Sequence, residues 1–228
     1  GRRRFIVDAA VPLFARKGFA GTTTKEIAEA AHVSEALVFK HFPSKAALYE
    51  EILQLGCEGD PALERISSLT ASTATLINMV HFMLRHFVLD SNGAGDMDVR
   101  QRLMLNSFLE DGEYGRLVCD WVFARVYPKI AECLRAAQAA GDLVELPIAL
   151  ENRFWFGQHV AAMMAYVRLS GRSAVPYHGT IDELITQAAW FILRGFGLKD
   201  EVIAGHPPPP PGPGCISANG AMHSHGDV

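Results

Sequence analysis

Residues 18–48, GFAGTTTKEIAEAAHVSEALVFKHFPSKAAL, decide the fold of this chain. Two short helical patterns lie inside this stretch, on either side of a break at residues 32–34. Thr23 followed three residues later by Glu26 forms a capping box, which predicts a helix over residues 25–31. The stretch therefore predicts a capped helix, a tight turn and a second helix.

The sequence after the break predicts two more helices. Ser34 is a good N-cap for a helix over residues 34–41. The pair Pro43-Ser44 ends that helix and caps a fourth one, which begins at Lys45 and continues past Leu55. Each helix thus has its own start signal, as expected of short helices packed at an angle to one another.

A supporting helix precedes the stretch. Its apolar residues recur at the spacing of a single helix face, namely Ile6, Ala9, Ala10, Leu13 and Phe14. Pro12 interrupts this pattern and predicts a kink or a strained turn. Gly18 then ends the helix.

Three helices in this order are typical of a helix-turn-helix DNA-binding domain. Ala28 is small enough for the second and third helices to cross closely, and the internal seam is predicted to consist of Ile27, Ala31, Val33 and Val38. His32 occupies the turn, where we expect a positive φ angle. Glycine adopts that conformation most easily, but His tolerates it better than most residues.

The same stretch resembles the TetR/AcrR family of regulators. The resemblance rests on an ordered series from Gly18 to Leu48: a glycine with a hydrophobic residue, paired threonines, Ile-Ala, Val-Ser, His-Phe and Ser-Lys. Two positions depart from the family pattern, because His32 replaces a glycine and Phe39 replaces a tyrosine. The resemblance covers about the first fifty residues, and beyond them only the layout of helices is similar.

Groove chemistry suggests how the helix over residues 34–41 would read DNA from the major groove. Glu35 can accept a hydrogen bond from a cytosine amino group, and Ala36 or Leu37 can touch a thymine methyl group. Lys40 can donate to guanine or to a phosphate. The alternative for Glu35 and Lys40 is an exposed ion pair.

The resemblance implies further contacts to the DNA backbone. Thr23 or Thr24, His41 and Lys45 are expected to hold phosphates, Lys45 from the N-terminus of its helix. Phe39 lacks the tyrosine hydroxyl, so one backbone contact is lost or the ring packs internally. The candidate DNA-binding residues are thus Thr23, Thr24, Ser34, Glu35, Ala36, Leu37, Phe39, Lys40, His41 and Lys45. The cluster Arg2-Arg3-Arg4 either adds contacts to phosphates or the minor groove, or is a solvated chain end.

The charge distribution agrees with this assignment. The formal net charge is -4. Residues 1–45 carry eight Lys or Arg and four acidic residues, which gives +4 and leaves -8 for the remainder. A basic end on an acidic chain fits a domain that faces a polyanion, although charged faces are often only solvated.

The rest of the chain predicts an all-α fold, because helical periodicity recurs and alternating strand patterns are missing. We expect helices near residues 61–70, 72–90, 97–112, 115–140, 147–170 and 181–197. Pro147 is expected in the first turn of its helix, and Thr180 with Glu183 forms a second capping box. The predicted organisation is a helix-turn-helix domain over 1–46, a helical ligand-binding and dimerisation domain over 47–198, and a Pro/Gly-rich, extended or disordered tail over 199–228.

The resemblance implies a homodimer that places two recognition helices about one DNA turn apart on a near-palindromic site. Its interface would consist of the helices near 147–170 and 181–197. The first carries small residues four apart, Gly157, Ala161 and Ala165, which permit close helix approach. The second is apolar nearly all round, so it must bury two faces.

A small-molecule effector is the second expected partner, and we expect it to release a repressor from DNA through a population shift. Methionines and aromatic residues of the body suit an adaptable pocket for an apolar or aromatic ligand, with two polar residues to orient it. The candidate residues are Met79, Phe82, Met83, Met104, Phe108, Trp121, Gln158, His159 and Met163, with Phe87 and Tyr166 nearby. Ordinary core packing is the alternative for each of them.

Other classes of function leave weaker traces. Nucleophile-elbow, P-loop, dinucleotide-binding and HExxH motifs and paired cysteines are missing, so we expect neither an enzyme nor a cofactor nor a metal site. Remaining alternatives are a metal- or redox-responsive regulator that uses the tail residues His206, Cys215, His223 and His225, and a non-sensing architectural DNA-binding protein. Unpaired cysteines in helical patterns favour the cytoplasm, and no apolar run reaches the roughly 18 residues of a membrane-spanning helix.

Overall fold

The computed structural model describes residues 1–57, 61–89, 96–110 and 112–207. Throughout these ranges the regular structure is helical, with one isolated antiparallel bridge between Leu143 and Leu198. The elements are α1 (Arg2–Lys17), α2 (Thr24–Ala30), α3 (Glu35–His41), α4 (Lys45–Cys57), α5 (Pro61–Ser68), α6 (Thr73–Leu89), α7 (Asp96–Leu109), α8 (Glu113–Ala139), α9 (Leu150–Tyr166), α10 (Ile181–Phe196) and α11 (Asp200–Ala204). The all-α prediction is confirmed.

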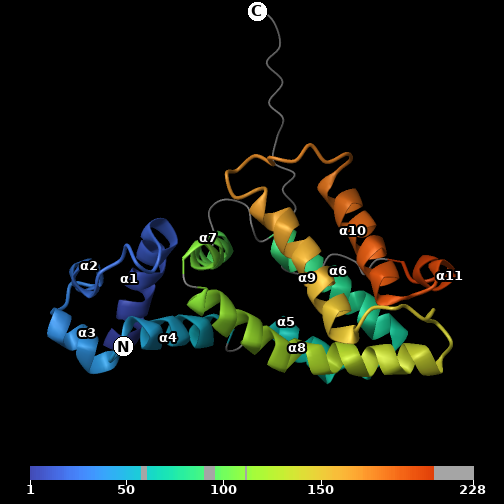
Figure 1. Ribbon diagram of the computed structural model, residues 1–228, viewed down its shortest axis with the longest axis horizontal. Helices are drawn as coiled ribbons and strands as arrows, with labels where there is room; N and C mark the ends of the chain where they lie inside the picture. The colour runs from blue at the N-terminus through green and yellow to red at the C-terminus, as the bar shows by residue number, and fades with distance from the viewer. Residues whose placement is uncertain (58–60, 90–95, 111, 208–228) are drawn as a thin grey trace, which may run out of the picture.

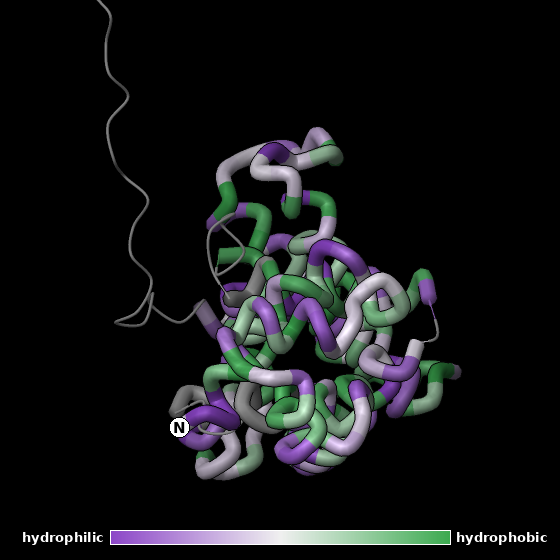
Figure 2. The backbone as a smooth tube through the Cα atoms, turned by 90° about the vertical axis from the view of Figure 1, so that its left-hand side faces the viewer, coloured by the Kyte–Doolittle hydropathy of each residue, from purple (hydrophilic) through white to green (hydrophobic). Residues whose placement is uncertain are grey.

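The first three helices form a head at one end of the molecule (Figure 1). Both local signals that defined it are confirmed: Thr23 and Glu26 form a reciprocal capping box on α2, and Ser34 caps α3. His32 has a φ of 51°, as the turn required. Pro12 lies within a continuous α1. Hydrophilic and hydrophobic segments alternate along the backbone (Figure 2), as amphipathic helices packed on shared cores require.

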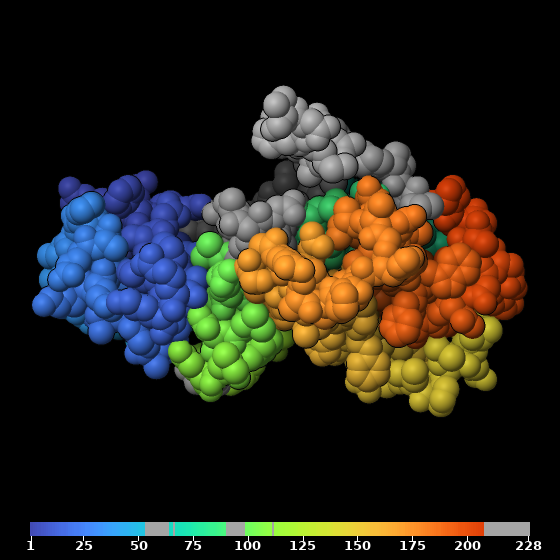
Figure 3. Space-filling view, turned by 90° about the horizontal axis from the view of Figure 1, so that it is seen from above, coloured from blue at the N-terminus to red at the C-terminus, as the bar shows by residue number. Residues whose placement is uncertain are grey.

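The body lies at the other end, with α7 between it and the head in the space-filling view (Figure 3). The long helix α8 extends from the head side to the far end of the body (Figure 1). Helices α6, α9 and α10 pack against one another, and α6 also packs against α8. The second capping box, formed by Thr180 and Glu183, begins α10 as predicted.

Two hydrophobic clusters divide the chain. The body cluster is built from α6, the second half of α8, and α9 to α11. The head cluster contains the buried residues of α1 to α4, but it also includes Leu103 and Met104 of α7 and Tyr114 of α8. Tyr49 is at its centre and lies 4.5 Å from the Phe14 ring and 5.2 Å from the Tyr114 ring, between centroids. The core of the head therefore extends into segments far away in the sequence.

The start of α9 differs from our prediction. The helix begins at Leu150 rather than at Pro147. The Arg153 guanidinium explains this difference, because it donates to the carbonyl oxygens of Leu146 at 2.9 Å, Ile148 at 2.9 Å and Phe196 at 3.1 Å. Loop carbonyl groups that accept hydrogen bonds from an arginine do not need partners within a helix.

The small residues of α9 face the interior of the chain itself. Gly157, Ala161 and Ala165 are all buried, and a Cβ atom on Gly157 would lie 2.9 Å from Cγ2 of Ile192 on α10. The close approach that we expected of this stripe is therefore made to α10 of the same chain.

Gly157→Ala tests this packing. We expect it to lower stability by about 1 kcal/mol or more, because the β-branched Ile192 is stiff and the added methyl group overpacks the contact. The control is Gly195→Ala in α10, where nothing lies within 4 Å of the added Cβ atom. That change is expected to be neutral or stabilising by up to about 1 kcal/mol. Thermal unfolding of both variants is the measurement, and equal melting temperatures would contradict the prediction.

The segment assigned to the tail begins with structure. Helix α11 covers Asp200–Ala204, and Ile203 is buried in the body cluster. An aliphatic residue that completes an apolar cluster stabilises a short helix that its composition alone does not predict. Residues 208–228 lie outside the described residues. None of the helices in the described ranges is long and apolar enough to cross a membrane.

Candidate nucleic-acid interface

The recognition helix α3 presents one face to the outside and one to the head core. Val38 is buried and packs in the head cluster, beside Ala28 and Ala31 of the preceding segment. The outward face carries Ser34, Glu35, Ala36, Phe39 and Lys40, all exposed, with Leu37 and His41 half-buried. Phe39 is 49% exposed, which argues against the alternative that its ring packs internally. The helix is thus oriented as a groove-reading helix requires.

Glu35 has a partner that sequence reasoning missed. The hydroxyl of Thr24 donates a hydrogen bond to Oε1 of Glu35 at 2.5 Å. This contact joins the first residues of α2 and α3, and it replaces the Glu35–Lys40 ion pair that we considered. Lys40 remains exposed. The Glu35 carboxylate has further acceptor sites besides the one that Thr24 uses. These sites remain for a hydrogen bond from the amino group of a base.

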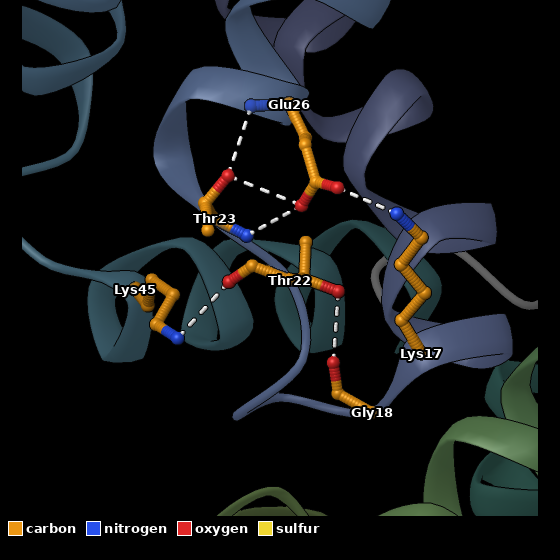
Figure 4. Close-up of polar contacts among 6 residues, drawn as sticks. All are labelled: Lys17, Gly18, Thr22, Thr23, Glu26 and Lys45. Carbon is orange, nitrogen blue, oxygen red and sulfur yellow. Dashed lines mark hydrogen bonds and ion pairs between the residues drawn. The ribbon is translucent and has the colours of Figure 1, made fainter.

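The cap of α2 is a charged network (Figure 4). Glu26 accepts from the Thr23 backbone N–H at 2.9 Å and from its hydroxyl at 3.1 Å. Its other oxygen accepts from Nζ of Lys17 at 2.5 Å. The Lys17 ammonium group and then the Thr23 donors lower the pKa of Glu26 to about 2. Thr23 is therefore fixed at the start of α2, and it is exposed there.

This network predicts a dependence of head stability on pH. Because the folded-state pKa of Glu26 lies below its ordinary value of 4.5, its stabilising effect is complete above that value and is lost as the pH falls toward 2. Glu26→Gln is expected to melt a few degrees below the unsubstituted chain at pH 7, by analogy with a lost cap, and the difference is expected to be clearly smaller at pH 2.5. Glu29→Gln on the same helix is the control. A constant difference between the two pH values would contradict this assignment.

Lys45 is used differently from our expectation. Its Nζ donates to the carbonyl oxygens of Phe19 at 2.8 Å and Thr22 at 3.1 Å, and it lies 4.2 Å from the centroid of the Phe19 ring. Two of its three N–H donors are therefore taken by the loop before α2. The residue holds that loop against α4, and at most one donor is left for a phosphate.

Two of the three N-terminal arginines are engaged within the chain. Arg3 donates to both carboxylate oxygens of Glu51, at 2.8 and 2.6 Å, and to the carbonyl of His41 at 3.0 Å. It also lies 4.5 Å from the centroid of the Phe42 ring. Arg4 pairs with Asp8 at 2.9 Å. Arg3 therefore fastens the start of α1 to α4 and to the end of α3, and is not part of a free cationic arm.

Asn106 of α7 and Glu110 just after it bind the head through three hydrogen bonds that sequence reasoning also missed. Oε2 of Glu110 accepts from the backbone N–H groups of Phe19 at 2.8 Å and Ala20 at 3.0 Å. Nδ2 of Asn106 donates to the carbonyl of Ala15 at 2.8 Å. All three partners are backbone groups at or just after the C-terminal end of α1. Only the spacing of Asn106 and Glu110, one helical turn apart, could have indicated a shared face.

The candidate ligand residues do not gather in one place. Met79 is buried in the body cluster, with Met83 packed against it, and the Phe82 ring stacks on His86. Met104 belongs to the head cluster instead, against which Tyr166 also packs. The others are partly buried or exposed on α7, α8 and α9: Phe108, Trp121, Gln158, His159 and Met163. The structure therefore splits this set between two clusters and the surface.

The tail alternative can be followed only at its first residue. The ring of His206 lies with Nδ1 2.7 Å from the carbonyl of Val202, whereas Cys215, His223 and His225 lie outside the described residues. Within the part of the chain that the structure describes, no three His, Cys, Asp or Glu residues are grouped as a metal site would need.

In sequence, the chain is similar to known proteins over its head. Residues 6–52 match the family model described as bacterial regulatory proteins of the tetR family. Over 48 residues the chain is 54% identical to the uncharacterized HTH-type transcriptional regulator YvkB of Bacillus subtilis. This stretch makes up 21% of this chain and 25% of YvkB. Over 54 residues it is 41% identical to the HTH-type transcriptional repressor KstR2 of Rhodococcus jostii, covering 24% and 26%. The matched part thus spans about a quarter of the length of these relatives.

Solved structures match nearly the whole chain. The structure of FadR from Bacillus subtilis in complex with stearoyl-CoA has a TM-score of 0.62 at 14% identity, over 84% of this chain and 98% of FadR. Salmonella enterica GusR has a TM-score of 0.54 at 18% identity, over 86% and 95%. At these identities the likeness concerns the fold, a helix-turn-helix head on a helical body. Residues 6–52 thus match a DNA-binding head of the tetR family, and the fold of nearly the whole chain is shared with solved structures such as FadR.

Proposed function

We propose that the chain is a sequence-specific DNA-binding transcriptional repressor of the cytoplasm that acts as a homodimer and is released from its operator by a small molecule. The observation that carries this proposal is the outward face of α3, which is held by a capped α2 within the matched residues 6–52. The relatives KstR2 and IcaR are described as a repressor and a negative regulator, which supports repression here.

Binding to DNA is the first test. Fluorescence anisotropy would compare the full chain on a fragment from upstream of its own gene with a scrambled fragment, at two salt concentrations. We expect tight, salt-sensitive binding to the native fragment alone. Equal, weak binding to both fragments would favour an architectural protein that reads only the backbone.

Lys40→Gln is expected to weaken operator binding by roughly tenfold and to reduce the salt slope by about one, because Lys40 is exposed on the face of α3 that we assign to DNA. Arg135→Gln, which removes an exposed cation on α8, is the control. If Lys40 reads a guanine instead, the loss is confined to operators that keep that base. An unchanged affinity would remove Lys40 from the interface.

The outer face of α9 and α10 supports a homodimer. Phe156 and Met163 are each 57% exposed, Trp190 is 37% exposed and Phe191 68% exposed. Between the two helices lies an open groove of about 1040 Å³, lined in part by Phe156, Trp190 and Phe191. Large exposed apolar residues gathered on one face are typical of an interaction surface. We therefore assign Met163, which we had expected in the ligand pocket, to the dimer face.

The helical body is where we place the binding site of the small-molecule effector. FadR was solved with stearoyl-CoA, which supports a ligand site in a body of this fold without naming the ligand of this chain. Partly buried Phe82 and Met83 of α6 are the expected residues that still suit an apolar ligand. Screening compounds for release of the DNA in the anisotropy assay tests this part.

A further inference from the structure

Helix α6 carries buried basic groups that the proposal above does not use. Its other buried side chains are mostly apolar and belong to the body cluster, among them Leu76, Ile77, Met79, Val80, Leu84 and Val88. His81 is only 4% exposed in their midst. Arg85 follows one turn later on the same face, with a side chain 17% exposed. Basic groups at such positions require an explanation, since the body as a whole is acidic.

One nitrogen of each of these two side chains lacks a hydrogen-bond partner among the described protein atoms around it. Within the described residues, Nδ1 of His81 and Nε of Arg85 are buried and have no hydrogen-bond partner. Asp182 at the start of α10 lies 3.6 Å from NH1 of Arg85, and its side chain is 71% exposed. Such a loose pair at the rim stabilises little. Buried polar groups are nearly always paired in folded proteins, so each exception requires an explanation, such as a functional role or a bound water or ion.

A third basic group belongs to the same end of the body. Arg168 follows the last turn of α9, and its Nε is also buried without a hydrogen-bond partner in the described structure. Helix α6 packs against both α9 and α10, and the ends of α9 and α10 are joined by the loop over residues 167–180. The basic groups thus come from two elements that lie together in the fold.

From this arrangement, and resting on the proposed function, we infer that the effector is an organic acid whose carboxylate is bound by Arg85 and His81. A guanidinium group presents parallel N–H donors that match the two oxygens of a carboxylate. The imidazole of His81 adds a donor beside it. The remainder of the molecule would meet apolar side chains of the body, which favours an organic acid over an inorganic anion.

The chemistry of His81 agrees with this role. Burial, and then the charge of Arg85, lower the pKa of His81. The ring is therefore uncharged near neutral pH and has a single N–H to donate. An acid that brings its own negative charge satisfies both side chains at once, whereas an uncharged ligand of the same shape leaves the guanidinium group with only the exposed Asp182 as a counter-charge.

The test uses thermal unfolding of the full chain without DNA, so that a failure of ligand binding is separated from a failure of DNA binding. The probes are matched pairs of one shape: decanoate and decanamide, 4-phenylbutyrate and its amide, 2-naphthoate and 2-naphthamide. We expect an acid to raise the melting temperature by roughly 5 °C at about 100 times its Kd, and its amide to have little effect. Equal shifts with acid and amide, or no shift with any acid, would overturn the inference.

Two variants make the test specific to these residues. Arg85→Met and His81→Leu are expected to abolish the shift caused by the acid, and to leave the melting temperature of the ligand-free protein equal or higher, because each removes an unsatisfied buried polar group. Arg135→Gln on α8, an exposed arginine bonded to its own helix, should keep the shift. A fall of several degrees in both ligand-free variants would show that the groups are structural and would also overturn the inference.

Discussion

Phe191→Asp is expected to convert the protein from a dimer of twice 24.9 kDa to a monomer of that mass and to weaken operator binding by at least about 100-fold. Phe191 is 68% exposed in the middle of α10, and in a dimer its ring would be removed from water. A carboxylate at that position would have to be buried without a partner, which an apolar interface does not tolerate.

The loss of DNA affinity follows from the linkage of the two heads. Two recognition helices held on one dimer bind two half-sites as a single event, whereas separate monomers bind each half-site alone. Size-exclusion chromatography with light scattering measures the mass, and anisotropy measures the affinity. The control is Leu69→Asp, which places the same charge on an exposed leucine in the turn between α5 and α6. A Phe191→Asp protein that stays dimeric would exclude this face as the interface.

The head could be predicted closely because its signals are local. A capping box needs only Thr23 and Glu26, three residues apart, and the turn at His32 needs only the length of the break between two helices. These signals depend on backbone geometry within a few residues, and the sequence contains them in full. The same holds for Thr180 and Glu183 at the start of α10.

The contacts that join distant segments could not be predicted in this way. Arg3 was expected to be solvated or to reach for DNA, but it binds Glu51, 48 residues away. Met163 and Met104 were placed in one pocket because both are methionines on helices, yet one is exposed on α9 and the other is buried in the head cluster. Helical periodicity indicates which face of a helix is apolar, but not which element will cover that face.

Glu110→Ala is expected to free the head from α7. The carboxylate of Glu110 accepts two backbone hydrogen bonds from residues 91 and 90 positions earlier, Phe19 and Ala20. These two N–H groups lie just after the end of α1. The carboxylate of Glu110 is their acceptor. Removal of the acceptor is expected to increase hydrogen exchange at both amides and to weaken operator binding by roughly tenfold, within the range usual for a coupling between sites.

The reason lies in how the head is oriented. With α7 fastened to the end of α1 by Glu110 and Asn106, and Leu103 of α7 buried in the head cluster, a shift of α7 must move the head with it. A head that is no longer fixed to α7 loses conformational entropy when the dimer binds two half-sites. This loss lowers the affinity for DNA. Glu132→Ala on α8, which also removes an exposed carboxylate, is the control. Unchanged exchange at Phe19 and Ala20, together with unchanged affinity, would mean that Glu110 does not couple α7 to the head, and that the coupling rests on Asn106 and on the packing of Leu103 and Met104.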